Sequence, residues 1–408
     1  MRAPFYLNRN FTANTLDGVL FSTGVGFFSH AGVVPLFVDG LTPARWPIAL
    51  VTPVLMIGIA LPQLLGAWAA DAPGAFWPLV VRAVWLPRLA LVLLAGVPFL
   101  PAPYVLPAFF AVWLGYALAL GFVIPLWLVV VAQVIPVEDR GKFFGIRTAL
   151  GGVAAALGAT AAAGVLARWP GPVGFAACFG LAAAFLVASL GAFFATRHDW
   201  AAFEAERAAR REAQPAFWAQ ARAVLAGEPA FRRYLAARVL MAGVVASTGF
   251  YAVHAVEAFG LTTAEGSLLA LAIIFGPNLT AAFWGWLADR VGNRAVQLPA
   301  VVAAGIASLW LATTPPLPVY VCLLVIAGFV TVVNQLVDNK FMMDLDAARC
   351  GLLLGVMNLV LTPFLLILPA AAGVLAERAG VPAVFAATGG CLGLSAAVLL
   401  LFPPRRVT

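Results

Sequence analysis

The sequence predicts an all-α membrane protein whose twelve transmembrane helices form two pseudo-symmetric six-helix bundles. Composition, the length of the apolar runs and the placement of basic residues lead to this prediction. Of the 408 residues, 63% are hydrophobic and 10% are charged, whereas soluble domains average about 25% charged residues. A soluble fold would have no polar cover for so much apolar surface, so we expect the lipid bilayer to be the main partner of this chain.

The apolar runs are continuous and close to the ~20 residues that a helix needs to cross a bilayer. They do not alternate between polar and apolar residues, which excludes a transmembrane β-barrel. Twelve runs are predicted as spans: 14–38, 46–67, 84–101, 104–135, 146–167, 172–195, 234–258, 265–288, 297–314, 317–338, 350–375 and 382–402.

The basic residues give the predicted orientation. If both termini lie in the cytoplasm, 20 of the 24 Lys and Arg residues fall on that side, and only Arg45, Arg168 and Arg378 fall on the other. Cytoplasmic loops carry such an excess of Lys and Arg. We therefore expect a multi-pass protein of the cytoplasmic (inner) membrane with both termini inside. The same loops account for the net charge of +7, so nucleic acid is not an expected partner.

One long polar segment divides the chain into an N-terminal bundle (1–195), a linker (196–233) and a C-terminal bundle (234–408). The linker mixes acids and bases around Trp200, Phe203, Phe217 and Trp218, a pattern typical of amphipathic helices on a membrane surface. We expect a solvated connector, and a regulatory role is the alternative.

The two halves resemble each other. At a constant offset, Phe11 corresponds to Phe231, and the Gly-Leu-Thr sequence at 40–42 corresponds to the same sequence at 260–262. Each half also holds six predicted spans. Together these matches predict a duplication, and paired six-helix halves with a binding site between them are a known transporter plan.

A loop motif follows the eighth predicted span, where residues 285–294 read GWLADRVGNR. This resembles the G-x-L-A-D-R-x-G-x-R loop that the major facilitator superfamily carries between spans two and three and again between spans eight and nine. The matching positions are Gly285, Asp289, Arg290, Gly292 and Arg294. The resemblance implies that this cytoplasmic cluster stabilises one conformation of a rocking cycle.

Two further loops carry parts of the resemblance. The first copy of the motif keeps Gly66 and Asp71 but lacks the basic turn. A loop around Arg140 resembles the one that the family carries after span four. The chain more generally resembles bacterial facilitators that are presumed to be exporters. However, the fifth span lacks the glycine–proline signature of the family's antiporters, which keeps an uptake permease open as an alternative.

Polar residues inside spans are costly and usually face a cavity or another polar group. On one face of the seventh span, Ser247, Tyr251 and His254 recur at helical spacing. The family likeness implies that spans one, four, seven and ten line a central cavity. Hydrogen bonding between neighbouring helices is the alternative role for each residue. The cavity candidates are Thr23, Phe27, His30, Trp113, Tyr116, Ser247, Tyr251, His254, Asn278, Asn334, Gln335 and Asn358.

Four charged residues are candidates for coupling or gating: Asp17, Arg238, Glu257 and Asp338. Asp17 and Arg238 lie near equivalent positions of the first and seventh spans, so a pair across the halves is one hypothesis. Snorkelling of their charged ends to the membrane interface is the alternative.

The function we predict is secondary active transport of a small organic solute by alternating access, with proton coupling and export preferred. A symporting uptake permease and an uncoupled facilitator are alternatives, and a receptor or membrane-embedded enzyme is a distant one. The four cysteines form no CxxC pair, and no metal, cofactor or catalytic residue is predicted. We expect a monomer.

Overall fold

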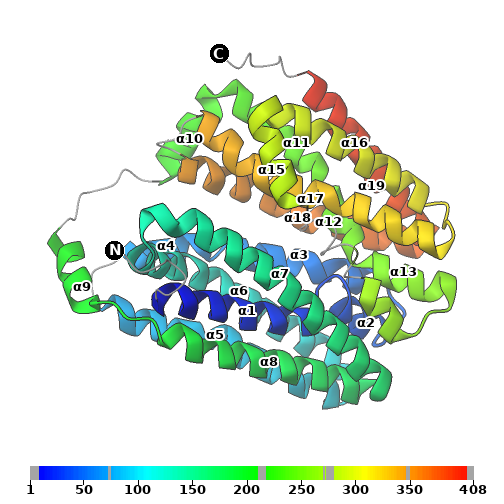
Figure 1. Cartoon of the computed structure of the whole chain (residues 1–408). Helices are drawn as coiled ribbons and strands as arrows, with labels where there is room; N and C mark the ends of the chain where they lie inside the picture. Colours follow the sequence, from blue (N-terminus) through cyan, green and yellow to red (C-terminus); the bar gives the residue numbers. More distant parts are fainter. Residues whose placement is uncertain are drawn as a thin grey trace. The chain divides into compact units, whose positions relative to one another are not determined.

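The structure is a computed structural model that describes residues 9–71, 75–209, 217–269, 272, 280–345 and 350–401. Within these ranges every regular element is a helix (Figure 1). The chain forms two compact units. Unit 1 comprises Met1–Phe37, Val54–Ala213 and Thr262–Leu268, and unit 2 comprises Val38–Pro53, Gln214–Leu261 and Leu269–Thr408. The units therefore differ from the predicted domains in two short segments, since Val38–Pro53 belongs to unit 2 and Thr262–Leu268 to unit 1.

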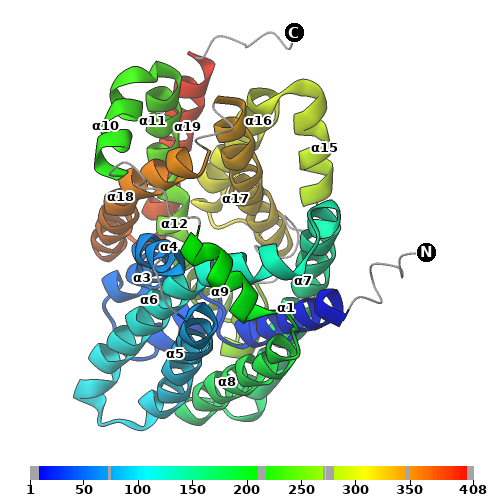
Figure 2. The same cartoon turned by 90° about the vertical axis from the view of Figure 1, so that its left-hand side faces the viewer.

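Unit 1 is built mainly of long helices. They are α1 (Arg9–Phe27), α4 (Gln63–Asp71), α5 (Phe76–Gly96) with the 3₁₀ turn η2 (Val97–Phe99), α6 (Ala102–Val134), α7 (Val137–Arg168), α8 (Pro172–Phe194) and α9 (Trp200–Ala209). Helices α2 (Val33–Asp39) and α3 (Trp46–Ala60) are divided between the units. Within unit 1, α1 packs against α7 and α8, and α5 packs against α6 and α8 (Figure 2).

Glycine brings α1 and α7 into close contact. A Cβ atom on Gly158 would lie 2.2 Å from the carbonyl oxygen of Thr23, and one on Gly26 would lie 2.2 Å from that of Ala155. Small residues at helix interfaces let the backbones approach closely, as is common in membrane bundles. These two positions therefore tolerate no side chain without a shift of the helices.

Unit 2 has a matching arrangement. Its helices are α10 (Phe217–Gly227), α11 (Pro229–Met241), α12 (Gly243–Thr248), α13 (Phe250–Phe259), α15 (Ala281–Val291), α16 (Asn293–Leu311), α17 (Leu317–Leu345), α18 (Cys350–Ala379) and α19 (Val381–Leu400). Residues 263–269 are also helical, and all of them but Leu269 belong to unit 1. Helices α11 and α12 pack against α18 and α19, as α1 packs against α7 and α8. In each half, the first span thus contacts the fifth and sixth, as the predicted duplication requires.

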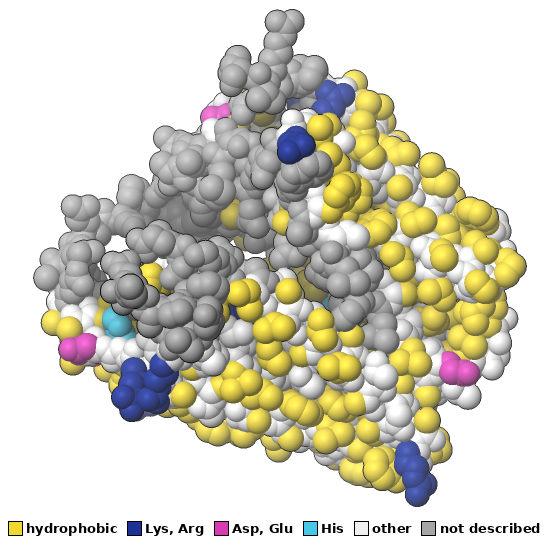
Figure 3. Space-filling model, viewed as in Figure 1, with side chains coloured by type: hydrophobic (Ala, Val, Ile, Leu, Met, Phe, Trp, Pro, Cys, Tyr) yellow, Lys and Arg dark blue, Asp and Glu magenta, His cyan; other side chains and the backbone are white. Residues whose placement is uncertain are grey.

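Eight helices in the described part of the chain are long and apolar enough to cross a membrane, or nine if the bent pair Pro229–Thr248 and Phe250–Phe259 forms one span. Their apolar windows are only 28–56% buried, which leaves wide faces for lipid. Figure 3 accordingly shows hydrophobic side chains over much of the described surface in that view.

Several predicted spans are corrected by the structure. The first is divided at residues 28–32, where Gly32 and Pro35 fall at the start of α2, and the second is divided at Leu61 and Pro62. Proline has no N–H to donate and disfavours a helical residue before it, which accounts for the second break. The helix of the third predicted span, α5, begins at Phe76, well before the predicted start of that span at residue 84. The eighth span lies partly outside the described residues.

Candidate functional site

Unit 1 holds a cluster of three charged side chains, of which Asp17 and Arg88 are buried and Arg147 is half-buried. Asp17 on α1 is 5% exposed, and its Oδ2 lies 3.6 Å from Nη2 of Arg147 on α7. The Arg147 guanidinium also lies over the Trp127 ring, 4.5 Å from its centroid. Arg88 on α5 is likewise 5% exposed and interacts electrostatically with Asp17. Two cations therefore share one carboxylate, and the ion pair is a loose one.

Arg88 is a functional candidate that the sequence analysis missed, because it was counted among the loop cations. In the structure, its Nη1 and Nε donate to the carbonyls of Val84 and Leu186, and its Nη2 donates to the Ser189 hydroxyl at 3.2 Å. The early start of α5 draws this arginine into the bundle. Its other two partners, Leu186 and Ser189, lie on α8 and are far away in sequence, so no local pattern indicated them.

Unit 2 holds a tighter network. Arg238 on α11 donates from Nε and Nη2 to the two carboxylate oxygens of Asp338 on α17, at 2.9 and 3.0 Å. The Tyr234 hydroxyl donates to the same carboxylate at 2.6 Å. Gln297 on α16 donates to Asn334 at 2.9 Å and to the Tyr234 hydroxyl at 3.4 Å. A bidentate, charge-assisted pair of this kind is strong and directional.

The structure therefore gives each of the coupling candidates Asp17 and Arg238 a partner in its own unit, Arg147 and Asp338 respectively. A pair between Asp17 and Arg238 across the halves stays a prediction. Each unit stabilises its charge with residues from other helices of the same bundle, and those partners are far away in sequence.

The aromatic candidates of unit 1 pack inside the bundle. Phe27 stacks on Phe185 with ring centroids 5.7 Å apart. Trp113 and Tyr116 on α6 are 0% and 2% exposed and meet the ring of Phe28 edge-on. Two polar candidates complete the set: the Thr23 hydroxyl donates to the carbonyl of Val19, and His30 lies in the turn between α1 and α2.

The polar stripe of the seventh span also has partners within its unit. The Ser247 hydroxyl lies 2.5 Å from that of Thr388 on α19, and the Tyr251 ring stacks on Phe385 with centroids 5.4 Å apart. His254 Nε2 lies 3.2 Å from the Thr314 hydroxyl in the loop between α16 and α17. The structure brings this stripe together with α19 and that loop. A role in substrate binding stays a prediction.

The remaining cavity candidates are scattered. Asn334 is buried in the Arg238 network, whereas Gln335 and Asn358 are exposed. Asn278 lies outside the described residues.

A second ionic cluster in unit 2 gathers around Arg45, in the segment between α2 and α3. Its guanidinium pairs with Asp39 at 3.0 Å and with Glu257 at the end of α13. The Arg45 N–H donates to the Glu377 carboxylate of α18 at 3.0 Å. Burial raises the pKa of Asp39, Arg45 lowers it and Glu257 raises it. A hollow of about 440 Å³ opens beside this cluster. Arg45 thus ties three helices together, and sequence reasoning had identified only Glu257 among them.

The loop motif forms the turn that the sequence predicts. Gly292 has φ 87°, which only glycine adopts readily, and it separates α15 from α16. Arg290 is exposed, and Arg294 donates to the carbonyl of Leu400 at 3.0 Å. Gly285 lies within α15, and the side chains of Asp289, Asp71 and Arg140 lie outside the described part of the structure. Among described residues, no group of His, Cys, Asp and Glu is arranged to hold a metal ion.

Comparison with known proteins identifies the family to which this arrangement corresponds. The model of the Major Facilitator Superfamily matches residues 16–362 and 252–408. No curated protein matches the chain in sequence.

Solved transporters share the fold at low sequence identity. A D-xylose–proton symporter has a TM-score of 0.72 at 14% identity, covering 98% of each chain. A nucleoside transporter has a TM-score of 0.71 at 15% identity, covering 96% of this chain and 97% of its own. A POT family transporter in complex with 5-aminolevulinic acid has a TM-score of 0.71 at 13% identity, covering 97% of each.

Proposed function

Because this chain belongs to the major facilitator superfamily, and is therefore a multi-pass membrane transporter rather than an enzyme, we propose that it moves a small organic solute by alternating access with proton coupling. No ATP-binding loop was found in the sequence, so an ion gradient is the available energy source. We further propose that the membrane is the cytoplasmic one and that both termini face the cytoplasm, as the placement of the basic residues predicts.

The observation that carries the coupling proposal is the loose pair between Asp17 and Arg147. At 3.6 Å, this pair lacks the close bidentate contact that Asp338 makes with Arg238. A proton on Asp17 would remove the attraction that holds Arg147 over α1, at the glycine interface between α1 and α7. Buried carboxylates in membrane helices mark proton and ion pathways in transporters. Asp17 is therefore the carboxylate that we propose carries the proton.

The state of Arg88 and Arg147 supports an uncharged or weakly charged solute. Arg88 is satisfied by two backbone carbonyls and a hydroxyl, and Arg147 is paired with Asp17. Both guanidinium groups therefore already have partners. A phosphate ester or another polyanion would need several buried cations of the protein that are not already paired. Export remains the predicted direction, and uptake is the alternative that the transport assay separates from it.

The test begins with a solute. Purified protein is screened by thermal shift against a broad compound library, because a ligand that binds only the folded state raises the melting temperature. Hits are then assayed in proteoliposomes with an imposed pH gradient. For the wild type we expect the solute to accumulate on the side set by the pH gradient. The side on which it accumulates also gives the direction of transport.

The matched variants are Asp17→Asn and Glu265→Gln, the latter changing a fully exposed carboxylate. We expect Asp17→Asn to exchange solute across the membrane while losing accumulation against its gradient, and Glu265→Gln to behave as wild type. Uphill transport with unchanged pH dependence in Asp17→Asn would remove Asp17 from the mechanism.

A further inference from the structure

The first part of the linker is fixed on one end of unit 1. Asn10 on α1 donates to the carbonyl of Arg197 at 2.8 Å and accepts from the Arg197 N–H at 2.9 Å. The Glu204 carboxylate of α9 accepts a hydrogen bond from the backbone N–H of Trp77 at 3.1 Å. This places a negative charge at the N-terminus of α5, where the helix dipole favours it. The segment leading into α9 is therefore a built part of the bundle.

Aromatic packing holds α9 in the same place. The rings of Trp77 and Trp200 stack with centroids 4.6 Å apart and an interplanar angle of 5°. Phe203 meets Phe76 edge-on at 5.4 Å, and His198 meets Trp200 at 4.7 Å. Two of the four aromatic residues that the sequence assigns to the linker, Trp200 and Phe203, thus cover the end of α5. Trp77 and Trp200 are half-buried, so the edge of this stack stays accessible.

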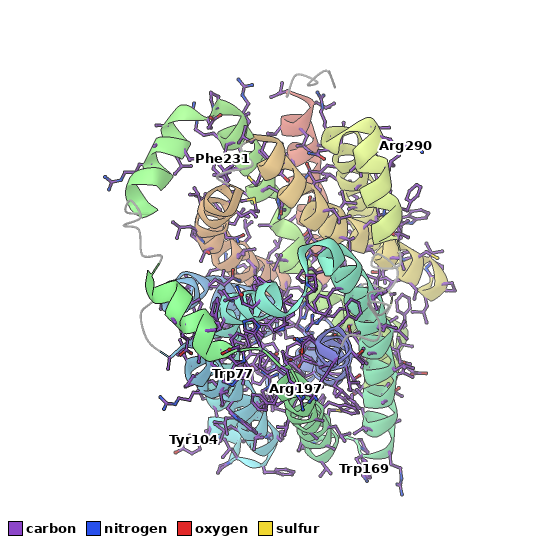
Figure 4. All side chains as sticks on the ribbon, turned by 60° about the vertical axis from the view of Figure 1, so that its left-hand side comes forward. Trp77, Tyr104, Trp169, Arg197, Phe231 and Arg290 are labelled. Carbon is purple, nitrogen blue, oxygen red and sulfur yellow. The ribbon has the colours of Figure 1, made fainter. Side chains whose placement is uncertain are left out.

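A hollow of about 620 Å³ opens at this edge. Its apolar wall is formed by Trp77, Phe194 and Trp200, and its polar wall by Arg197, His198 and Asp199. The hollow lies beside Trp77 and Phe194, at the ends of two candidate spans, Phe76–Phe99 and Pro172–Phe194. At such ends we expect the lipid headgroups. Figure 4 labels Trp77 and Arg197 near each other at the α9 end of unit 1. In Figure 3, basic, histidine and acidic side chains all appear at that end.

The hollow is lined by one cation, Arg197, and one carboxylate, Asp199. Among the described residues no carboxylate pairs with the exposed Arg197 side chain. The Asp199 carboxylate accepts the Ala202 N–H at 3.0 Å and so caps α9. Arg9 adds a second cation next to this segment, since its Nε donates to the carbonyl of Ala195 at 3.0 Å. An anion at this position would meet Arg197 first.

We propose that this hollow binds the headgroup of an anionic phospholipid from the surrounding leaflet, with the phosphate on Arg197 and the glycerol region against Trp77 and Trp200. Tryptophan is the residue that proteins place at headgroup depth, and juxtamembrane cations select anionic lipids. The lipid adds to the contact between α9 and α5 within unit 1, so its occupancy sets how firmly α9 is held there.

The test uses the purified full-length protein in detergent, titrated separately with phosphatidylglycerol, phosphatidylcholine and soluble glycerol 3-phosphate. Binding is read by native mass spectrometry, and its place by hydrogen exchange of residues 196–204. Arg197→Gln is compared with Arg168→Gln, which changes an exposed arginine at the far end of α7 in the same unit.

We expect phosphatidylglycerol to bind the wild type and Arg168→Gln alike and to slow exchange of residues 196–204. We expect Arg197→Gln to bind it about five-fold more weakly, the contribution of one arginine near an anionic surface. Equal affinity in the two variants, equal binding of phosphatidylcholine, or exchange slowed equally by soluble glycerol 3-phosphate would each overturn the proposal, the last by identifying a soluble anion as the ligand.

Discussion

The pair between Arg238 and Asp338 allows a quantitative test of how unit 2 is stabilised. The two side chains are 16% and 11% exposed and make two hydrogen bonds to each other. Replacing Asp338 by leucine leaves the guanidinium buried without a counter-charge. Removing one partner of a buried pair costs about 3–5 kcal/mol. The slight exposure of both groups places Asp338→Leu at the lower end of that range, at about 3 kcal/mol.

The double variant Arg238→Met with Asp338→Leu separates this explanation from a simple loss of packing. Replacing a buried ion pair by apolar residues of similar volume is often neutral or stabilising. We therefore expect the double variant to be within about 1 kcal/mol of the wild type, with the remaining loss coming from the hydrogen bond of Tyr234.

The assay is equilibrium unfolding of the purified protein in mixed micelles of increasing SDS content, followed by tryptophan fluorescence. If Asp338→Leu unfolds at the wild-type midpoint, the pair does not stabilise the unit. A double variant as unstable as Asp338→Leu alone would mean that the cost arises from shape, and the electrostatic reasoning would be refuted.

Three further predictions concern single positions. Gly158→Ala should destabilise the protein by about 1–3 kcal/mol because the new Cβ would meet a carbonyl oxygen of α1, whereas Gly164→Ala on the same helix, with open space around it, should be neutral or stabilising in a thermal melt. Burial raises the pKa of Asp39 against the lowering effect of Arg45, so the contribution of Asp39 to stability is present in acid and is lost as pH rises through the folded pKa. Asp39→Asn should remove that pH dependence from the melting temperature. An unchanged profile of melting temperature against pH would contradict this. The backbone N–H and the hydroxyl of Thr262 donate to the Glu265 carboxylate and lower its pKa, so this cap is lost as pH falls through the folded pKa. Glu265→Ala should speed hydrogen exchange at the start of helix 263–269 at neutral pH. Unchanged protection would refute the cap.

The Arg45 cluster illustrates why charged residues outside the spans are hard to interpret from sequence. Asp39, Glu257 and Glu377 are distant in the chain, and each alone is typical of a solvated loop. The fold places all three around one guanidinium and its backbone N–H. Their shared partner could be identified only once the ends of α2, α13 and α18 were placed.

The sequence by itself determined the class of the protein. Long apolar runs leave a chain no solvent but lipid, and in lipid each backbone group must be paired within a helix. The GWLADRVGNR segment indicated the family because a tight turn with glycine at a positive φ, flanked by arginines, leaves a local signature. Both features depend on residues that are close in the chain, and the structure and comparisons confirm them.

Only the tertiary structure decided which charges pair and which faces are buried. Helical periodicity places Ser247, Tyr251 and His254 on one face, but it carries no information on which helix covers that face, and α19 does so together with the loop after α16. The sequence alone places Arg88 among the loop cations and Trp200 on the linker. Only the packed helices show that Arg88 lies inside the bundle and that Trp200 stacks on Trp77. In each case the partner is far away in sequence, so the interaction depends on the packing of whole helices, which a local pattern does not specify.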